Sequence, residues 1–127
     1  MFHVKQISTG SPFEAALGYS RAVVKGGWCF VSGVTGFDYA TMVMPDTAAA
    51  QTSACFDTIS EVLKQAGFEM ADVVRVQYTL VDAALVDEIA PVLHRLLGVI
   101  RPAATVVIAG LIRPEMKIEI EVTAFRG

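Results

Sequence analysis

The clearest alternation of apolar and polar positions lies near the end of the chain, between Lys117 and Ala124. In an extended strand, successive side chains point to opposite faces, so this segment has one apolar face and one largely charged face. The apolar residues are Ile118, Ile120, Val122 and Ala124, and the polar residues are Lys117, Glu119, Glu121 and Thr123. Residues Ala103 to Leu111 are almost wholly apolar, which is typical of a strand buried on both faces. We predict that these two strands form a hairpin with its turn at Arg113–Glu115.

The N-terminal part of the chain predicts three further strands. Residues His3 to Ser8 form the first, and a loop from Thr9 to Gly18 follows, because Gly, Ser and Pro interrupt it. Residues Tyr19 to Lys25 and Trp28 to Ser32 then predict a hairpin. The two glycines that link them suit a type I′ turn, in which both positions need a positive φ.

A first amphipathic helix is predicted from Asp46 or Thr47 to Ala66. Either of its first two residues can accept a hydrogen bond from a free backbone N–H, and Gly67 suits the position just after the last turn. The apolar stripe that should face the core is Cys55, Ile59, Val62, Leu63 and Ala66.

A strand and a second helix follow. The strand runs from Val73 to Val81, and Asp82 can cap a helix from Ala83 to Leu97. Pro91 lies inside that helix and should kink or break it, because proline removes one backbone hydrogen bond and clashes with the preceding turn. The core-facing positions are Val74, Val76, Tyr78 and Leu80 on the strand and Leu85, Ile89, Val92, Leu93 and Leu96 on the helix.

This order of elements predicts an α+β fold, a two-layer sandwich in which both helices cover one face of a mixed sheet. The second face of the sheet is then bare. Its expected occupants are Arg21, Trp28, Phe30, Arg75, Gln77, Glu119 and Glu121. An exposed tryptophan and two carboxylates only about 7 Å apart are unfavourable on a bare face, so we expect another copy of the chain to cover it.

Composition limits the classes of function. The 127 residues predict a single domain covering residues 1–127, with 54% hydrophobic residues and a net charge of −3. No basic run suggests nucleic acid, no apolar run reaches membrane-spanning length, and the first residues do not resemble a signal peptide. Cys29 and Cys55 do not suggest disulfides or a metal site, and we expect a cytoplasmic protein.

Residue chemistry alone leaves the role of Glu119 open. A carboxylate on a sheet face is usually solvated or paired, here with Arg75 or Lys117. Ser32 has no adjacent His or Asp that would activate it as a nucleophile. His3 and His94 are poorly placed to form a metal site together.

Several short motifs in the chain together resemble the RidA (YjgF) family of small trimeric proteins, also called enamine/imine deaminases. The matching pieces are Gly18-Tyr19, Val31–Gly33, Ala50–Thr52, Ala66-Gly67, Asp72–Val76, Arg101–Ala103 and Met116–Glu121. The resemblance covers nearly the whole chain and implies a chorismate-mutase-like sandwich with a six-stranded sheet. It also implies a homotrimer joined through the open sheet faces, with a ligand cleft at each subunit interface.

The resemblance implies roles for several residues. Glu119 matches the glutamate that positions the attacking water, and Tyr19 matches a tyrosine of the pocket. Ser32 and Gly33 match the turn that lines the cleft. In the family's Pro-Ala-Arg motif an arginine clamps the substrate carboxylate, but here the motif is Pro102-Ala103-Ala104, followed by Thr105 at the same site. Alanine cannot replace the bidentate guanidinium.

Three interpretations of Ala104 remain open. Arg101 or Arg21 could supply the missing cation, or the substrate could lack a carboxylate at that position. In either case the expected activity is hydrolysis of a reactive imine or enamine with release of ammonia, which requires no cofactor or metal. Alternatively, the trimer is not catalytic and binds a metabolite or acts like a chaperone.

Overall fold

The computed structural model describes residues 4–127, so His3 of the expected first strand lies outside the described residues. The main elements are β1 Val4–Ile7, α1 Pro12–Leu17, β2 Ala22–Lys25, β3 Trp28–Val34, α2 Ala48–Gln65, β4 Val73–Leu80, α3 Val86–Leu97, β5 Ala103–Ile108 and β6 Ile118–Phe125. Two short 3₁₀ turns, η1 Met70–Asp72 and η2 Ala83–Leu85, precede β4 and α3 respectively.

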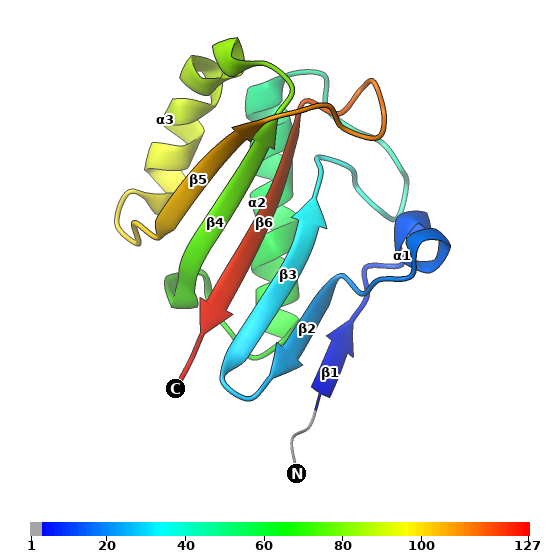
Figure 1. Ribbon diagram of the computed structural model, residues 1–127, viewed down its shortest axis with the longest axis vertical. Coiled ribbons are helices and arrows are strands. Elements are labelled where there is room, and N and C mark those ends of the chain that lie inside the picture. The colour runs from blue at the N-terminus through cyan, green and yellow to red at the C-terminus, as the bar shows by residue number, and fades with distance from the viewer. Residues whose placement is uncertain (1–3) are drawn as a thin grey trace.

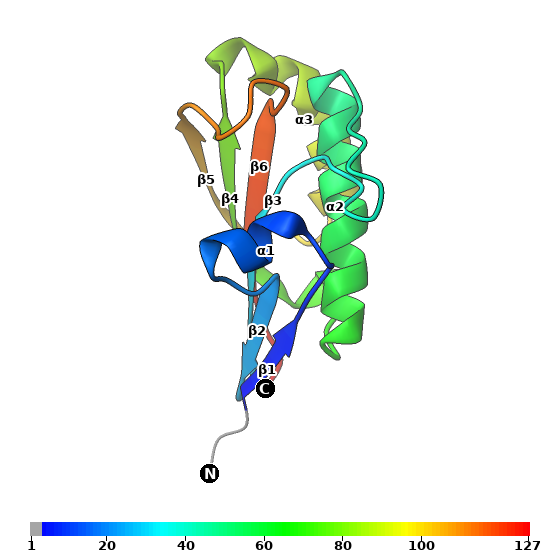
Figure 2. The same ribbon diagram turned by 90° about the vertical axis from the view of Figure 1, so that its right-hand side faces the viewer.

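The six strands form one mixed sheet in the order β1-β2-β3-β6-β4-β5 (Figure 1). In the part of the chain that the structure describes, only the pair β4–β5 is parallel, and the other four pairs are antiparallel. Helices α2 and α3 pack against the same face of the sheet, and within residues 4–127 no helix covers the middle of the other face (Figure 2). The predicted two-layer α+β sandwich with a six-stranded sheet is therefore confirmed.

The predicted hairpin of the last two strands is wrong, because β4 lies between β5 and β6. Tyr78 of β4 is opposite Val106 on one side and opposite Ile120 on the other. The reason is the helix before β5: a strand–helix–strand unit returns the chain to its starting end, so β5 runs parallel beside β4. Strand β5 is thus an edge strand, and all six of its residues are exposed in the single chain rather than buried on both faces.

The first predicted helix and its caps are confirmed. Thr47 is the N-cap of α2, and its hydroxyl accepts a hydrogen bond of 3.1 Å from the backbone N–H of Ala50. Gly67 follows the helix with φ of 85°, a conformation that glycine adopts without strain. The side chains of α2 that are buried against the sheet include Cys55, Ile59, Val62 and Leu63.

The second helix differs from the prediction near its start. Asp82 caps the short turn η2, and the α-helix proper begins only at Val86. It continues without a break through Pro91. Pro91 and Asp87 are both exposed, so water can hydrate the Asp87 carbonyl that the proline leaves without a donor. Near the end of the helix Leu97 is buried, whereas Leu96, which the pattern placed inward, is exposed.

The loop predicted over Thr9–Gly18 contains the short helix α1. Ser11 is its N-cap, and Glu14 completes a capping box in which the two side chains satisfy each other's backbone N–H groups. Pro12 occupies the first turn and Gly18 ends the helix with φ of 73°. The Ser-x-x-Glu spacing is the sequence signature that predicts this helix.

The predicted hairpin of β2 and β3 is confirmed, with Lys25 opposite Trp28. Its turn is not type I′, because Gly26 has a φ of 58° but Gly27 has no positive φ. Gly27 is instead required by a close approach of the chain end. A Cβ at Gly27 would lie 2.8 Å from the Arg126 carbonyl oxygen, and the Arg126 N–H donates to the Gly27 carbonyl over 2.8 Å.

A β-bulge in β4 corrects the predicted core face of that strand. Val73 is opposite Ala124 and Arg75 is opposite Thr123, so Val74 is an extra residue in the ladder. Val73 is buried and Val74 is exposed, which reverses the expectation for Val74. Beyond the bulge, Val76, Tyr78 and Leu80 are buried as the alternation predicts.

Aromatic side chains occupy one end of the open sheet face. Trp28 is 43% exposed, Phe30 is 48% exposed and Phe125 is 41% exposed. The ring centroids of Trp28 and Phe125 are 4.6 Å apart, and those of Trp28 and Phe30 are 6.2 Å apart. Arg75 and Glu121 are also exposed, but Arg21 is fully buried, contrary to the expectation of a bare-face arginine.

Candidate functional site

A second β-bulge shapes the candidate site, at Ser32 and Gly33 in β3. Val31 is opposite Val122 and Val34 is opposite Ile120, so two residues of β3 face a single residue, Glu121, of β6. The extra residue brings the Gly33 backbone against the side chain of Glu119. A Cβ added to Gly33 would lie 2.5 Å from the Glu119 Cδ atom, so only glycine fits here without displacing the carboxyl group.

Ser32 is held by the backbone of the two residues that precede β2. Its hydroxyl lies 2.9 Å from the carbonyl oxygens of both Ser20 and Arg21 and donates to them. The Ser32 N–H also donates to the Arg21 carbonyl over 2.9 Å. These bonds fix the bulge and occupy the hydroxyl hydrogen, so Ser32 is arranged to support the site rather than to act as a nucleophile.

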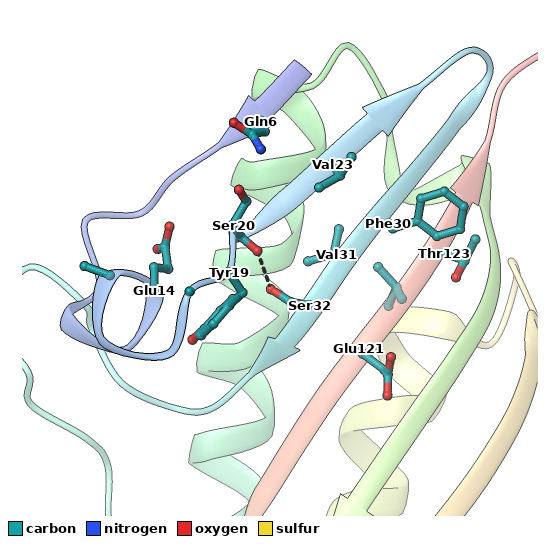
Figure 3. A pocket seen from close by; sticks show the side chains of 13 residues that line it. Gln6, Glu14, Tyr19, Ser20, Val23, Phe30, Val31, Ser32, Glu121 and Thr123 are labelled. Carbon is teal, nitrogen blue, oxygen red and sulfur yellow. Dashed lines mark hydrogen bonds between the residues drawn. The ribbon is translucent and has the colours of Figure 1, made fainter. Parts of the chain in front are cut away.

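A cavity of about 640 Å³ opens beside the bulge, on the uncovered face of the sheet (Figure 3). Tyr19 and Ser32 line it, and their contact with a substrate stays a prediction. Glu121 lines it too, whereas Glu119 lies next to Gly33 and is not part of the lining. The other lining side chains come mainly from α1, β2, β3 and β6 and include Glu14, Val23, Phe30 and Thr123.

Glu119 is only partly exposed, and its surroundings change its acidity. Burial is the main cause that raises the pKa of the Glu119 carboxyl above 4.5, and the nearby charge of Glu121 raises the pKa further. The positive charge of Arg21 opposes both effects. A carboxyl group with a raised pKa can hold and release a proton closer to neutral pH than an exposed one can.

Arg21 lies behind the bulge and is 0% exposed. Its Nη1 donates to the Gly33 carbonyl over 2.6 Å, and its Nη2 donates to the Tyr19 hydroxyl over 3.4 Å. The guanidinium carbon lies 4.7 Å from the ring centroid of Tyr39 and 5.6 Å from that of Tyr19. Contact between Arg21 and a substrate stays a prediction, but its contacts with Tyr19 and Gly33 bring it into the same cluster as Glu119.

Tyr39 is a member of this cluster that the sequence did not single out. Its hydroxyl accepts a hydrogen bond of 3.0 Å from the Thr35 N–H and lies 3.2 Å from the Thr35 hydroxyl. The buried ring is thereby fixed against the guanidinium of Arg21. Because Tyr39 lies in an irregular segment with no periodicity, no pattern in the sequence could have identified it.

Arg101 and Ala104 lie in a second cavity, of about 390 Å³, between β5 and α3. Tyr78, His94 and several apolar side chains complete its lining. Burial raises the pKa of Tyr78 to about 12, so its hydroxyl stays protonated. The two cavities share no lining residue, so the single chain does not bring Arg101 and Ala104 together with Tyr19 and Ser32.

Thr105 lies on the opposite face of β5 from Ala104. It is opposite Gln77 of β4, and its hydroxyl accepts a hydrogen bond of 3.3 Å from Nη1 of Arg75. Thr105 therefore belongs to the open sheet face, whereas Ala104 is opposite the buried Val76 and faces the helix layer.

The remaining chemistry of the described residues is limited. Cys29 and Cys55 are both buried free thiols; burial raises the pKa of Cys29 to about 11 and also raises that of Cys55, so neither is a ready nucleophile. Within residues 4–127, no three His, Cys, Asp or Glu side chains come together in a group that could hold a metal ion. The described helices also include none with the length and apolar character needed to cross a membrane.

Comparisons with known proteins agree on one family. The family model described as Endoribonuclease L-PSP matches residues 9–126. The protein SCO2049 of Streptomyces coelicolor is 30% identical over 125 residues, covering 98% of this chain and 93% of its own length.

Solved structures share the fold as well. The crystal structure of Rv2704 from Mycobacterium tuberculosis, a member of the YjgF/YER057c/UK114 family, superposes with a TM-score of 0.90 at 38% identity, covering 98% of this chain and 100% of that one. The YjgF gene product of Escherichia coli gives a TM-score of 0.84 at 25% identity, covering 97% and 99% respectively. The family model and these relatives match almost the full described length of the chain. This chain therefore belongs to the YjgF/YER057c/UK114 family, also known as the RidA or L-PSP family.

Proposed function

We propose that this chain is a cytoplasmic RidA-type hydrolase that acts on a small, reactive imine or enamine and releases ammonia. The observation that carries the proposal is the Glu119 carboxyl, which is partly buried against Gly33 and has a raised pKa. The resemblance to the enamine/imine deaminases supports the reaction class, and the geometry supports Glu119 as the residue that handles the proton.

The proposed reaction needs only water and proton transfer. Glu119 as a carboxylate takes a proton from water as the oxygen attacks the carbon of the C=N bond. The protonated carboxyl then returns the proton to nitrogen, and collapse of the carbinolamine gives a carbonyl product and ammonia. An enamine would first gain a proton at carbon from water and return a proton from nitrogen to water, which gives the imine. No cofactor or metal is required by these steps.

We further propose that the working form is a homotrimer joined through the open sheet faces, with the cleft completed by a neighbouring subunit. The exposed aromatic cluster of Trp28, Phe30 and Phe125 and the exposed apolar side chains of β5 support this assembly. A trimer could also bring the Arg101 and Ala104 cavity of one subunit beside the Tyr19 cavity of the next. Sedimentation equilibrium tests the assembly, and a monomer at working concentration would contradict it.

Recognition of the substrate depends on the region around Ala104. Arg101 lines the same cavity as Ala104 and is therefore the candidate to replace the missing guanidinium. If Arg101 binds a carboxylate, the substrate is a 2-imino acid. If it does not, the apolar lining favours an imine that has no carboxylate at this position.

The test is ammonia release from freshly generated imines and enamines, with and without a carboxylate. We expect Glu119→Gln to abolish turnover while the assembly stays intact, and Glu61→Gln, at an exposed position on α2, to keep wild-type activity. Normal turnover by Glu119→Gln would refute the assignment of Glu119.

A non-catalytic trimer that binds a metabolite or acts like a chaperone is the second candidate. The observation that favours it is Ala104, because alanine supplies no charge or hydrogen bond to a substrate. Absence of turnover by the wild-type protein on the whole panel, together with saturable binding of a small molecule, would select this alternative.

A further inference from the structure

The positive charge of the buried Arg21 has no directly paired carboxylate among the described residues. The side chain is 0% exposed, and its Nε is the one buried side-chain nitrogen or oxygen atom among residues 4–127 that has no hydrogen-bond partner. Among those residues, the ion pair within 4.0 Å is between Arg126 and Asp72, not at Arg21. Burying an arginine without a direct carboxylate partner is costly, so its retention at this place calls for a physical reason.

The contacts of Arg21 suggest that reason. Its two terminal nitrogens donate to Gly33, which is the bulge residue against Glu119, and to Tyr19, which lines the large cavity. Tyr39 packs against the guanidinium and limits its movement. A single planar group thus connects the bulge, the cavity wall and an anchored aromatic ring. Lysine has one nitrogen and no plane, so it could not reproduce this arrangement.

The charged and titratable groups around Glu119 are few. Glu121 lies two residues away on the same strand, Cys55 lies on α2, and Arg21 lies behind the bulge of β3. On β4, the residues opposite Glu119 and Glu121 are the uncharged Thr79 and Gln77. Glu14 of α1 also interacts with the Arg21 charge, but its carboxylate is occupied by Thr9 and Ser11. Among the described residues, Arg21 is therefore the cation that acts on Glu119.

We infer that Arg21 is a positioning residue of the candidate active site, which holds the Ser32–Gly33 bulge and Tyr19 in place around the Glu119 carboxyl. The inference rests on the proposed function only for the role of Glu119 in turnover. The arginine acts through Gly33 and Tyr19, and through its charge, rather than by touching substrate. Because Arg21 is more than nine-tenths buried, this role differs from direct binding of a substrate carboxylate, which an arginine at a site would otherwise suggest.

The test follows the Glu119 carboxyl by ¹³C NMR titration and measures kcat and its pH profile on the same samples. In Arg21→Gln we expect the pKa of Glu119 to rise, because the opposing positive charge is lost, and kcat to fall on the order of 100-fold through misplacement of the bulge. Arg95→Gln removes an exposed arginine of α3 that lines neither cavity and is the matched control, which should leave both measurements unchanged.

Arg21→Lys separates charge from geometry and serves if Arg21→Gln does not fold. It should keep the Glu119 titration near that of the wild type, shift the Gly33 amide resonance and still lower kcat. An unchanged Glu119 titration in folded Arg21→Gln, or an unchanged Gly33 resonance and kcat in Arg21→Lys, would overturn the inference. The NMR measurements need no turnover, so they decide the role of Arg21 even if the wild-type protein proves inactive on imines.

Discussion

Gly33 and Glu119 are so close that a Cβ atom added to Gly33 would lie 2.5 Å from Cδ and 2.8 Å from Oε1 of Glu119. The contact arises from the bulge in β3, which gives that strand one residue more than β6 across the stretch from Ile120 to Val122. Without the bulge, the residues of β3 would keep alternating between the two faces of the sheet, and the Gly33 backbone would not turn toward this carboxyl group. The candidate site is thus built by an irregularity in an otherwise regular sheet.

Gly33→Ala should therefore move the Glu119 carboxyl and impair turnover. The new methyl group cannot fit at 2.5 Å, and the carboxyl group must shift to make room. We expect kcat to fall on the order of 100-fold, which is typical of a misplacement of about 1 Å at a reacting group. Steady-state kinetics on the imine panel would measure the effect.

The matched control for this change is Gly110→Ala. An added Cβ at Gly110 would meet no atom within 4 Å, and this glycine has no positive φ. It should keep wild-type kcat. If both variants behaved alike, the close approach of Gly33 to Glu119 would have no functional importance.

Glu119→Gln should make the folded protein more stable at neutral pH. A carboxyl whose folded-state pKa is raised binds protons more tightly in the folded state than in the unfolded state, so wild-type stability falls as pH rises from 4.5 through that raised pKa. Glutamine removes the titration. The Tm difference between variant and wild type should therefore be small below pH 4.5 and grow in favour of the variant toward neutral pH.

Thermal unfolding across pH 3 to 8 measures this effect, with Glu115→Gln, at an exposed position, as the control that should show no such growth. A Tm difference that stays constant with pH would mean that Glu119 titrates normally. That result would also remove the main physical support for its proposed role as an acid and base.

Glu14 should behave in the opposite way. Burial by itself raises the pKa of Glu14, but hydrogen bonds from Thr9 and Ser8 and the charge of Arg21 together lower it below 4.5. Glu14 therefore adds stability that is fully present above 4.5 and is lost as pH falls through its lowered pKa. Glu14→Gln should cost on the order of 1 kcal/mol at pH 7, because the hydrogen bonds from Thr9 and the attraction of Arg21 depend on the negative charge, and much less under strongly acidic conditions.

Denaturant unfolding at pH 7 and at pH 3 tests this, with Glu61→Gln as a control on the exposed side of α2. If Glu14→Gln lowered the free energy of unfolding equally at both pH values, the Glu14 side chain would contribute to stability by its shape and not by its charge.

The sequence predicts well those elements whose own periodicity determines them. Helix α2 carries its cap at Thr47, its apolar stripe and its terminal Gly67 within one segment, so no knowledge of the rest of the chain is needed. Strand β6 is similarly self-contained, because its alternation matches the burial of Ile118, Ile120 and Val122. Sheet order is different, since it depends on which strands meet, and the apolar run of β5 looked the same as that of a central strand.

In the candidate site, too, some residues could be predicted from the sequence and others could not. Tyr19, Ser32, Gly33 and Glu119 could be named from short motifs, and the structure groups them around one bulge. The burial of Arg21 could not be predicted, because arginine is seldom fully buried and its aromatic partner Tyr39 comes from an irregular segment. Likewise, the alternation of β6 cannot tell which of Glu119 and Glu121 lines the cavity, because both point to the same face.

The cavity between β5 and α3 gives the sharpest test of substrate recognition. Ala104 faces this cavity together with Arg101, at the position where the resemblance implies an arginine that binds a carboxylate. Ala104→Arg should supply a guanidinium there, and the KM for 2-imino acids should fall relative to that for imines without a carboxylate. A change of about 10-fold corresponds to roughly 1.4 kcal/mol, which is within the range of one charge-assisted hydrogen bond.

Ala90→Arg is the matched control, because it makes the same change at an exposed position of α3 that does not line the cavity. It should leave the relative preference for the two substrate types unchanged. If Ala104→Arg and Ala90→Arg altered the preference equally, the added guanidinium would be acting through general charge, and the cavity beside α3 would not be the carboxylate site. If Ala104→Arg alone weakened turnover of substrates without a carboxylate, the alanine itself would be the specificity determinant, because its small side chain leaves space that these substrates occupy.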